Sequence, residues 1–319
     1  MTMNTTRAAI IDGYGPPKAL RIGRVPLPEP GQGEVQVGVH AAGINAIDWQ
    51  TRADRGVPLS GFPAVLGWDI SGTVTHTGPG VTTMKAGDQV FGMPNFPGLA
   101  GGYADHVTAS ADSLAIKPEG VTHHSAAGTP MAALTAWQAL FDLGGLSSGQ
   151  RVLIQGAAGG VGHIAVQLAA NAGAEVIGTA STGNHAFVEG LGAHEVLDYS
   201  AAPVEKAVHD VDVVVDPRGG QEALRLLDVL RPGGILVTLK GDDARLTEAA
   251  RARGLRVGFV YVAPDGAGLA NLAALMAEGR LRIAVENVLP LDKAADAHMI
   301  GETGHVRGRL VLDTLWGRG

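Results

Sequence analysis

The residues of this sequence best suited to bind a ligand are the glycines of the segment 155–162, which reads QGAAGGVG. An apolar run precedes the segment and an alanine-rich run follows it, so we expect a strand, a glycine turn and a helix. In such a turn Gly159 lets backbone N–H groups approach a pyrophosphate, and Gly162 lets the helix pack closely on the sheet. The helix N-terminus adds unpaired N–H groups and the positive end of its dipole. The predicted phosphate-binding residues are Ala157, Gly159, Gly160, Val161 and Gly162.

Ala157 stands where the fingerprint of dinucleotide-binding proteins has its first glycine. A tight strand-to-helix turn that binds no ligand is therefore the alternative interpretation. The surrounding sequence bears on this choice, because a dinucleotide site needs alternating strands and helices around the turn.

Strand and helix patterns alternate along the chain from residue 151 onward. This alternation is typical of parallel βαβ units with right-handed crossovers, and it predicts an α/β fold with a doubly wound, parallel Rossmann sheet. We expect strands at 151–155, 175–179, 195–197, 211–216, 234–239 and 256–261, and helices at 161–172, 184–191, 221–230 and 244–253.

The residues before position 121 differ from this pattern, because short apolar segments alternate with Pro- and Gly-rich turns. They predict an antiparallel, β-rich domain. We expect the end of the chain to leave the nucleotide-binding domain and to rejoin the β-rich one. The predicted domains are 1–124 with 269–319 and 125–268. Expected strands lie at 7–11, 34–41, 70–77, 89–92, 104–108, 280–289 and 309–313, and expected helices at 122–127, 131–143 and 269–278.

Composition argues against several classes of function. The 319 residues carry a formal net charge of −7 and their 24 Lys and Arg residues are scattered, which argues against binding of nucleic acids or anionic membranes. Cysteine is absent, which excludes disulfides, thiol catalysis and cysteine-ligated zinc. No run of about 18 apolar residues predicts a membrane span. The polar start of the sequence lacks the apolar core of a signal peptide, and we expect a cytoplasmic protein.

The end of the second strand of a Rossmann sheet distinguishes the two nicotinamide dinucleotides. A carboxylate there binds the ribose hydroxyls of NAD and repels a 2′-phosphate. No Asp or Glu occurs between Thr179 and Phe187. Ser181 and Thr182 can donate to a 2′-phosphate and His185 can add charge, which favours NADP(H). The alternative is an ordinary polar loop with relaxed cofactor choice, because no Lys or Arg lies in this segment.

Seven strings spread over nearly the whole chain point to one family. They are AAGINAID at 41–48, GWDISG at 67–72, GDQVFG at 87–92, GGYA at 101–104, AALTAWQAL at 132–140, LRPGG at 230–234 and GHVRGRLVL at 304–312. In order and spacing the chain resembles the zinc-free, zeta-crystallin-like quinone oxidoreductases of the medium-chain dehydrogenase/reductase superfamily. The resemblance implies a GroES-like β-rich catalytic domain, a Rossmann domain inserted into it, and an active site between them. It also implies a homodimer joined through the last Rossmann strand. This strand has a free edge, and pairing it with the same strand of a second copy would satisfy its backbone hydrogen-bonding groups.

The resemblance also implies roles for single residues. Asn45 is implied to line the nicotinamide pocket, or alternatively to stabilise a turn. Thr135 is implied to contact the nicotinamide or ribose, or alternatively to bond its own helix backbone. Asp48 is the candidate proton donor, although an exposed aspartate is mostly ionised at neutral pH. Further implied cofactor contacts are Tyr199, Leu239, Phe259, Val260 and Arg309.

The chain departs from the family pattern at three places. Residues 216–220 read DPRGG where the family commonly has DTVGG, so proline removes a backbone donor and arginine adds charge. Arg309 replaces a usual lysine and keeps its charge. The segment 50–60 contains no tyrosine, which argues against the branch of enoyl-thioester reductases that use one as a proton donor.

We expect no metal site, unlike in the zinc-dependent alcohol dehydrogenases of the same superfamily. Those enzymes carry Gly-His-Glu where this sequence has Gly67, Trp68 and Asp69, and they use cysteine ligands that this sequence lacks. His123 and His124 are adjacent, so they cannot both face one ion from a helix.

Without a metal or a thiol, the simplest chemistry is direct hydride transfer from a nicotinamide to an electrophile. The predicted function is a zinc-independent, NADPH-dependent oxidoreductase that reduces a quinone or a related enone. One alternative is a reductase of α,β-unsaturated carbonyls or enoyl thioesters. The other is a non-catalytic, NADP(H)-binding sensor. The predicted partners are a small-molecule substrate and a second copy of the chain.

Overall fold

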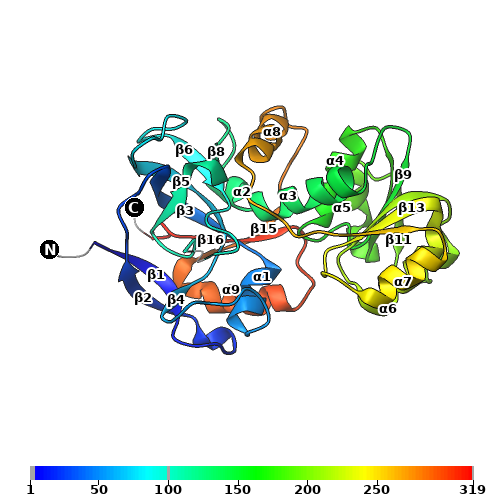
Figure 1. Ribbon diagram of the computed structural model, residues 1–319, viewed down its shortest axis with the longest axis horizontal. Coiled ribbons are helices and arrows are strands. Elements are labelled where there is room, and N and C mark those ends of the chain that lie inside the picture. Colours follow the sequence, from blue (N-terminus) through cyan, green and yellow to red (C-terminus); the bar gives the residue numbers. More distant parts are fainter. Residues whose placement is uncertain (1–3, 99–100, 318–319) are drawn as a thin grey trace. The chain divides into compact units, whose positions relative to one another are not determined.

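The structure is a computed structural model that describes residues 4–98 and 101–317. The chain divides into two compact units, Met1–Leu134 with Ala263–Gly319, and Thr135–Val262. Figure 1 shows the helices and strands of both. We call the first the β-rich unit and the second the Rossmann unit. The domain boundaries given by the sequence patterns stay a prediction.

The Rossmann unit contains a six-stranded parallel sheet in the order β11-β10-β9-β12-β13-β14. Strands β9, β10 and β11 follow one another in one direction across the sheet, and β12, β13 and β14 follow one another in the other direction. With right-handed crossovers, the helices that connect the first three strands and those that connect the last three therefore cover opposite faces of the sheet. Figure 1 shows α6 and α7 together on one side of this sheet. The predicted doubly wound sheet is therefore confirmed. Its strands are β9 (Arg151–Ile154), β10 (Glu175–Ala180), β11 (Glu195–Asp198), β12 (Val211–Asp216), β13 (Leu230–Thr238) and β14 (Arg256–Phe259), and its helices are α4 (Gly162–Asn171), α5 (His185–Gly190), α6 (Gly220–Leu226) and α7 (Ala244–Ala252).

Burial on both faces explains why the central strands of this unit are almost continuously apolar. One face of the sheet packs against α6 and α7 in a single hydrophobic cluster. Members of this cluster include Leu153, Val214 and Leu236 from the strands and Ala223, Leu226, Leu246 and Ala250 from the helices.

The β-rich unit contains a larger sheet in the order β15-β16-β3-β5-β6-β8, in which β7 also pairs with β3. A small sheet in the order β2-β1-β4 lies in the same unit. Strand β16 runs antiparallel to β3, so the end of the chain rejoins the β-rich unit as predicted. The strands are β1 (Thr5–Ile11), β2 (Arg21–Pro26), β3 (Glu34–Ile44), β4 (Ala64–Val65), β5 (Asp69–Thr77), β6 (Gln89–Gly92), β7 (His106–Ser110), β8 (Leu114–Ile116), β15 (Val285–Pro290) and β16 (Arg309–Asp313).

The sequence patterns missed two short helices of the β-rich unit that matter for the site. These are α1 (Ala46–Arg52) and α9 (Ala294–Glu302), which are too short to show a clear helical repeat. The expected helix at 131–143 also divides, because a π-helical segment at Gln138–Leu143 follows α3 (Pro130–Trp137). The remaining helices are α2 (His123–Ala127) and α8 (Gly266–Ala277).

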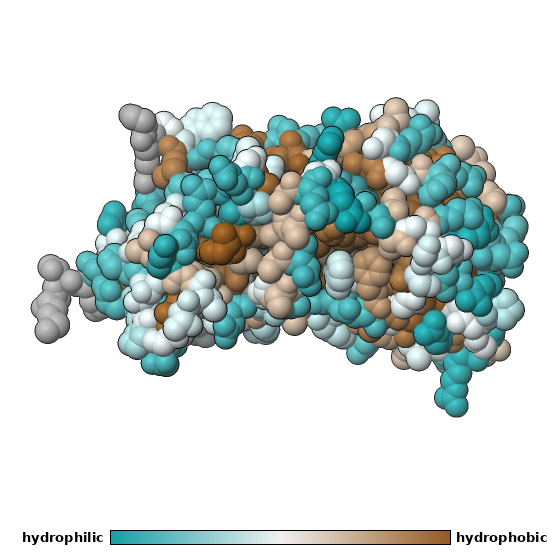
Figure 2. Space-filling view, turned by 90° about the horizontal axis from the view of Figure 1, so that it is seen from above, coloured by the Kyte–Doolittle hydropathy of each residue, from teal (hydrophilic) through white to brown (hydrophobic). Residues whose placement is uncertain are grey.

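Hydrophilic residues cover most of the face seen in Figure 2, with apolar residues interspersed among them. Such mixing is normal for a folded protein, since polar groups cannot cover the whole surface. In the part of the chain that the structure describes, no helix combines the length and the apolar character that a membrane span requires.

Candidate functional site

The glycine turn lies between β9 and α4, as predicted. Gly156 has a positive φ of 62°, and its N–H donates to the Thr179 hydroxyl at 3.0 Å. A Cβ on Gly162 would lie 2.2 Å from the Gly156 carbonyl oxygen and 2.9 Å from the Ala157 Cα. Glycine at 162 is therefore required by the close passage of the turn over the start of the helix.

Ala157 fits the position of the missing fingerprint glycine for two reasons. The left-handed backbone conformation of the turn falls on Gly156, so residue 157 does not need it. The buried methyl group of Ala157 also faces Gly178 on β10, where an added Cβ would lie only 2.9 Å from it. The departure from the fingerprint is thus accommodated by two glycines, Gly156 and Gly178, that are not fingerprint positions themselves.

The N-terminus of α4 offers hydrogen-bond donors of the kind that a phosphate needs. Among the described residues, the backbone N–H groups of Gly160, Val161 and Gly162 have no protein acceptor. The first paired donor is His163, whose N–H reaches the Gly159 carbonyl at 3.1 Å. Unpaired donors and the helix dipole at one point favour an anion there. The turn therefore fits a dinucleotide pyrophosphate.

Beside this turn, the structure places a carboxylate against the predicted cofactor loop. Strands β10 and β11 pair in parallel with Ala180 opposite Asp198, which brings the Asp198 carboxylate to the loop that follows β10. The Thr182 hydroxyl donates to Asp198 Oδ2, and the Thr182 N–H reaches the same oxygen at 3.2 Å. The loop lacks a carboxylate of its own, but the next strand supplies one.

Asp198 is firmly held in its ionised form. Its Oδ1 accepts from the Ser200 N–H at 2.8 Å and from the Ser200 hydroxyl at 2.5 Å. Hydrogen bonds from Ser200 and Thr182 hold the pKa of this carboxyl well below its usual range. A permanent negative charge therefore lies against one of the two hydroxyls that we predicted to bind a 2′-phosphate.

The other predicted residues of this loop bond mainly within it. Ser181 Oγ accepts from Asn184 Nδ2 at 3.2 Å, which leaves its own O–H available to donate. His185 Nε2 lies 3.4 Å from the Ala180 carbonyl oxygen. Ser181 thus keeps the capacity that the NADP(H) prediction requires, whereas the ring of His185, at the start of α5, faces back toward the end of β10.

Tyr199 and Arg218 meet at the carboxyl-terminal edge of the Rossmann sheet. Tyr199 is 45% exposed, and the guanidinium of Arg218 lies 5.6 Å from the centre of its ring. Asp216 holds the loop of Arg218, because its carboxylate accepts from the N–H groups of Arg218 and Gly219, both at 2.9 Å. Arg218, which departs from the family pattern, is thus held next to Tyr199, the residue predicted to contact the adenosine.

In the β-rich unit, Asn45 lies in a buried polar cluster at the start of α1. Its Nδ2 donates to Asp69 Oδ2 at 2.8 Å, and its Oδ1 accepts from Arg309 Nη2 at 2.7 Å. Arg309 also lies 3.3 Å from Asp69 Oδ2. The second N–H of the Asn45 amide is not used by these contacts, so the side chain can still donate one hydrogen bond.

Asp48 belongs to the same cluster and is not the exposed aspartate that we assumed. It is fully buried, and its Oδ2 accepts from the Asn45 N–H at 2.7 Å and the Tyr103 hydroxyl at 2.8 Å. Its Oδ1 has no partner in the described residues. Burial raises the pKa of Asp48 to about 7 and that of Asp69 to about 6, against the opposing effect of Arg309.

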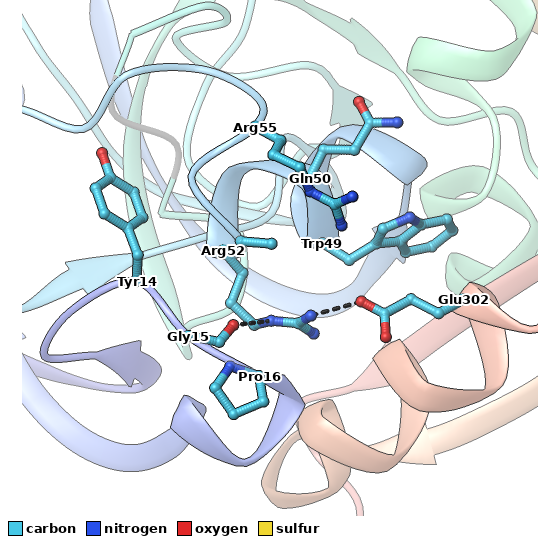
Figure 3. Close-up of a pocket in the computed structure, with 9 residues that line it drawn as sticks. Tyr14, Gly15, Pro16, Trp49, Gln50, Arg52, Arg55 and Glu302 are labelled. Atoms are coloured by element: carbon cyan, nitrogen blue, oxygen red, sulfur yellow. Dashed lines mark hydrogen bonds and ion pairs between the residues drawn. The ribbon is translucent and has the colours of Figure 1, made fainter.

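A chain of hydrogen bonds connects Asp48 to the surface of the β-rich unit. The Tyr103 hydroxyl lies 3.1 Å from His298 Nε2, and His298 Nδ1 lies 3.1 Å from Arg52 Nη1. Arg52 donates to the Gly15 carbonyl at 3.0 Å and pairs with Glu302, as Figure 3 shows. Arg52 and Glu302 line a surface pocket of about 970 Å³ together with Trp49, Gln50, Arg55 and four other residues.

Along this series of hydrogen bonds, each group donates to the next one in the direction of Asp48. Because Arg52 has only donors, His298 must accept at Nδ1 and carry its proton on Nε2. The histidine then donates to Tyr103, and Tyr103 donates to Asp48. Burial and the neighbouring Arg52 lower the pKa of His298 to about 3. Since Arg52 does not release a proton, the chain orients and stabilises the Asp48 carboxylate but does not conduct protons from the pocket.

The remaining predicted residues lie in both units. Thr135 is 8% exposed on α3, in the Rossmann unit next to its boundary at Leu134. Leu239 follows β13 and Val260 follows β14, where their N–H groups donate to the Asp216 and Thr238 carbonyls. Phe259 is half-buried at the end of β14. The structure therefore brings together Asn45, Asp48 and Arg309 in the β-rich unit, and Ser181, Thr182 and Tyr199 in the Rossmann unit.

Several residues of these two clusters were not predicted as site residues. Asp69 and Tyr103 occur only within family strings, with Asp69 also at the place of a zinc ligand, and His298 and Arg52 gave no signal in the sequence. Asp198 did give one, since it directly follows the strand predicted at 195–197. The carboxyl ends of adjacent parallel strands meet at one edge of the sheet, so its proximity to Thr182 was open to prediction.

Comparison with known proteins agrees with this architecture. Residues 31–119 match the family described as "Alcohol dehydrogenase GroES-like domain", and residues 191–312 match the family described as "Zinc-binding dehydrogenase". The NAD(P)H oxidoreductase RTN4IP1, mitochondrial, of Danio rerio is 34% identical over 97% of this chain and 91% of its own length. The chloroplast envelope quinone oxidoreductase homolog of Arabidopsis thaliana is 32% identical over 91% and 92%.

Solved structures agree as well. The quinone oxidoreductase of Coxiella burnetii superposes with a TM-score of 0.91 at 37% identity, over 98% of this chain and 100% of that one. The chain belongs to the quinone oxidoreductase branch of the medium-chain dehydrogenase/reductase superfamily. Another member, the Escherichia coli quinone oxidoreductase complexed with NADPH, superposes with a TM-score of 0.86 at 27% identity, over 97% and 100%.

The names of the relatives mention zinc binding and cellular locations, and both bear on the predictions made for this quinone-oxidoreductase-type chain. Within residues 4–98 and 101–317, no three His, Asp or Glu side chains are grouped so that they could hold a metal ion. Several relatives are named mitochondrial or chloroplastic, so the predicted cytoplasmic location is not a property of the whole branch.

Proposed function

We propose that this chain reduces a quinone or a related enone with hydride supplied by NADPH. The observation that carries the proposal is the glycine turn at 156–162, where three backbone N–H groups at the start of α4 have no protein acceptor among the described residues. A helix N-terminus of this kind at the carboxyl edge of a Rossmann sheet is suited to a pyrophosphate. Relatives named quinone oxidoreductases support the class of acceptor.

The β-rich unit contributes the polar groups that such a reduction needs. Asn45 keeps one amide N–H that can donate to a carbonyl oxygen of the substrate. Reduction of a quinone or enone also consumes a proton, and Asp48 is the proposed donor. With a pKa of about 7, its carboxyl group is about half protonated at neutral pH, which suits a general acid.

NADPH is the proposed donor because Ser181 retains a free O–H and the loop that follows β10 carries no acidic residue of its own. The preference over NADH is expected to be small, because the Asp198 carboxylate touches the neighbouring Thr182. Thr135, Tyr199, Leu239, Phe259 and Val260 stay predicted cofactor contacts. A homodimer through β14, which forms one edge of the sheet, also stays a prediction.

Steady-state oxidation of NADPH tests the proposal with a panel that contains benzoquinone, naphthoquinone, a simple enone and a crotonyl thioester. We expect turnover with the quinones or the enone. Exclusive turnover of the thioester would support the alternative reductase. Tight binding of NADPH without turnover of any acceptor would support the sensor. The Gly162→Ala variant serves as a control for non-enzymatic reduction, because its phosphate turn is blocked.

Fluorescence titration tests the cofactor separately. We expect a lower Kd for NADPH than for NADH, by less than about tenfold, because Ser181 favours the phosphate and Asp198 opposes it. Equal dissociation constants would contradict the NADPH preference but leave the reductase proposal standing.

A further inference from the structure

Asp198 lies outside the predicted cofactor loop, but its place at the end of β11 brings it close to where the adenosine ribose of a dinucleotide would bind. It is the last residue of β11 and pairs with Ala180, the last residue of β10. Both strands end at the same edge of the sheet, where a Rossmann fold binds the adenosine ribose. The loop that begins with Ser181 therefore passes directly beside the carboxylate.

The contacts of this carboxylate change what the loop can offer to a ligand. Thr182 has a single O–H, which donates to Asp198. Its hydroxyl can therefore accept a hydrogen bond from a ligand but cannot donate one to a phosphate. The Thr182 N–H is directed to the same carboxylate at 3.2 Å. Of the two hydroxyls predicted to bind a 2′-phosphate, only that of Ser181 remains able to donate.

The nearby positive charge does not compensate fully for this carboxylate. Arg218 lies over the ring of Tyr199, the residue after Asp198, at 5.6 Å. It also forms an ion pair with Glu222 at 3.2 Å. Asp198 itself is ionised at every working pH, because four hydrogen bonds from Thr182 and Ser200 stabilise its charged form.

We infer that Asp198 limits the preference for NADPH over NADH, because its carboxylate repels a 2′-phosphate and tolerates a free 2′-hydroxyl. In many Rossmann folds a carboxylate at the end of the second strand has this effect. Here the third strand supplies the carboxylate, and Thr182 connects it to the end of the second. The inference rests on the proposed dinucleotide site, and it adds a residue that opposes the phosphate at that site.

Binding of the half-cofactors 2′,5′-ADP and ADP, measured by isothermal titration calorimetry, tests this inference without turnover. Asp198→Asn removes the charge and keeps an acceptor oxygen for Ser200. We expect it to tighten 2′,5′-ADP by about tenfold and to change ADP by less than about threefold. The gain should shrink when salt rises from about 50 mM to about 500 mM, since the effect is one of charge.

Two further variants separate charge from structure. Glu195→Gln makes the same change of charge at the opposite end of β11, and we expect it to leave both affinities within about twofold. Thr182→Val removes the hydroxyl and keeps the carboxylate, and we expect its affinity for 2′,5′-ADP relative to ADP to stay below that of the Asp198→Asn protein.

Three results would overturn the inference. They are an equal change in the affinities for both half-cofactors, a gain that does not depend on salt, and a Thr182→Val protein that reproduces the shift of Asp198→Asn. Failure of the wild-type protein to bind either half-cofactor would refute the dinucleotide site together with the inference. Absence of quinone turnover, in contrast, would refute only the proposed reaction, because the ratio of the two affinities would still be measured.

Discussion

Replacing Asp48 with asparagine is expected to stabilise the protein increasingly as the pH rises. The carboxyl group is fully buried, and one guanidinium, that of Arg309, serves both Asp48 and Asp69. Asparagine keeps an acceptor oxygen for the Tyr103 hydroxyl and the Asn45 N–H. The substitution therefore removes a buried charge while it preserves the hydrogen bonds of Oδ2.

The magnitude follows from the pKa of Asp48, which burial raises from 3.8 to about 7. Because the folded-state pKa lies above the unfolded-state value, the contribution of Asp48 to stability is fully present below about pH 4 and is lost as the pH rises through about 7. At about 1.4 kcal/mol per pKa unit, the difference in unfolding free energy between Asp48→Asn and wild type should grow by about 2–3 kcal/mol from about pH 5 to about pH 8.

Urea unfolding followed by tryptophan fluorescence at several pH values measures this difference. The signal is suitable because Trp49, Trp68 and Trp316 all lie in the same unit as Asp48. Asp292→Asn is the control, since Asp292 is exposed and its replacement should give a difference that does not change with pH. A pH-independent difference for Asp48→Asn would show that Asp48 does not ionise in this range, and the reasoning about the buried cluster would fail.

Three other substitutions test separate parts of the structure. Gly162→Ala places a Cβ 2.2 Å from a carbonyl oxygen of the turn. We expect the unfolding free energy, measured by chemical denaturation, to fall by about 1–3 kcal/mol and NADPH to bind more weakly. Gly190→Ala is the control, because a Cβ there meets open space and should change neither quantity. Arg309→Met leaves two buried carboxylates without their cation, and urea unfolding should show a loss of about 3–5 kcal/mol at about pH 8 and a smaller loss at about pH 5. Arg218→Met removes the cation from the Tyr199 ring and should raise the Kd of 2′,5′-ADP by about threefold to tenfold, and an unchanged Kd would show that this arginine does not contact the nucleotide.

The Rossmann unit was predictable because its signals are local. Parallel strands buried on both faces are continuously apolar, and the helices between them have their own repeat, so the elements could be recognised along the chain. The glycine turn was predictable for the same reason, since a close backbone approach requires glycine whatever surrounds it. Even the substitution at Ala157 is explained by positions nearby in the fold, Gly156 and Gly178.

The short helices α1 and α9 were not predictable from such signals. Each is shorter than three turns, and the N-cap of α1 is Asn45, whose side chain is held by groups far away in the sequence. Tertiary contacts rather than helix propensity stabilise helices of this length. The same contacts place Arg52 and His298 in one hydrogen-bonded chain, although 246 positions separate them.

By itself, the sequence determined the fold class, the order of the two units and the place of the phosphate turn, because periodicity and glycine act over a few residues. Only the tertiary structure decided the charge environment of the candidate site. Burial and a shared arginine give Asp48 its raised pKa, and the pairing of β10 with β11 brings Asp198 to Thr182. Electrostatic energies depend on distance and burial in space, and a carboxylate 16 positions away along the chain can therefore change what a predicted binding loop prefers.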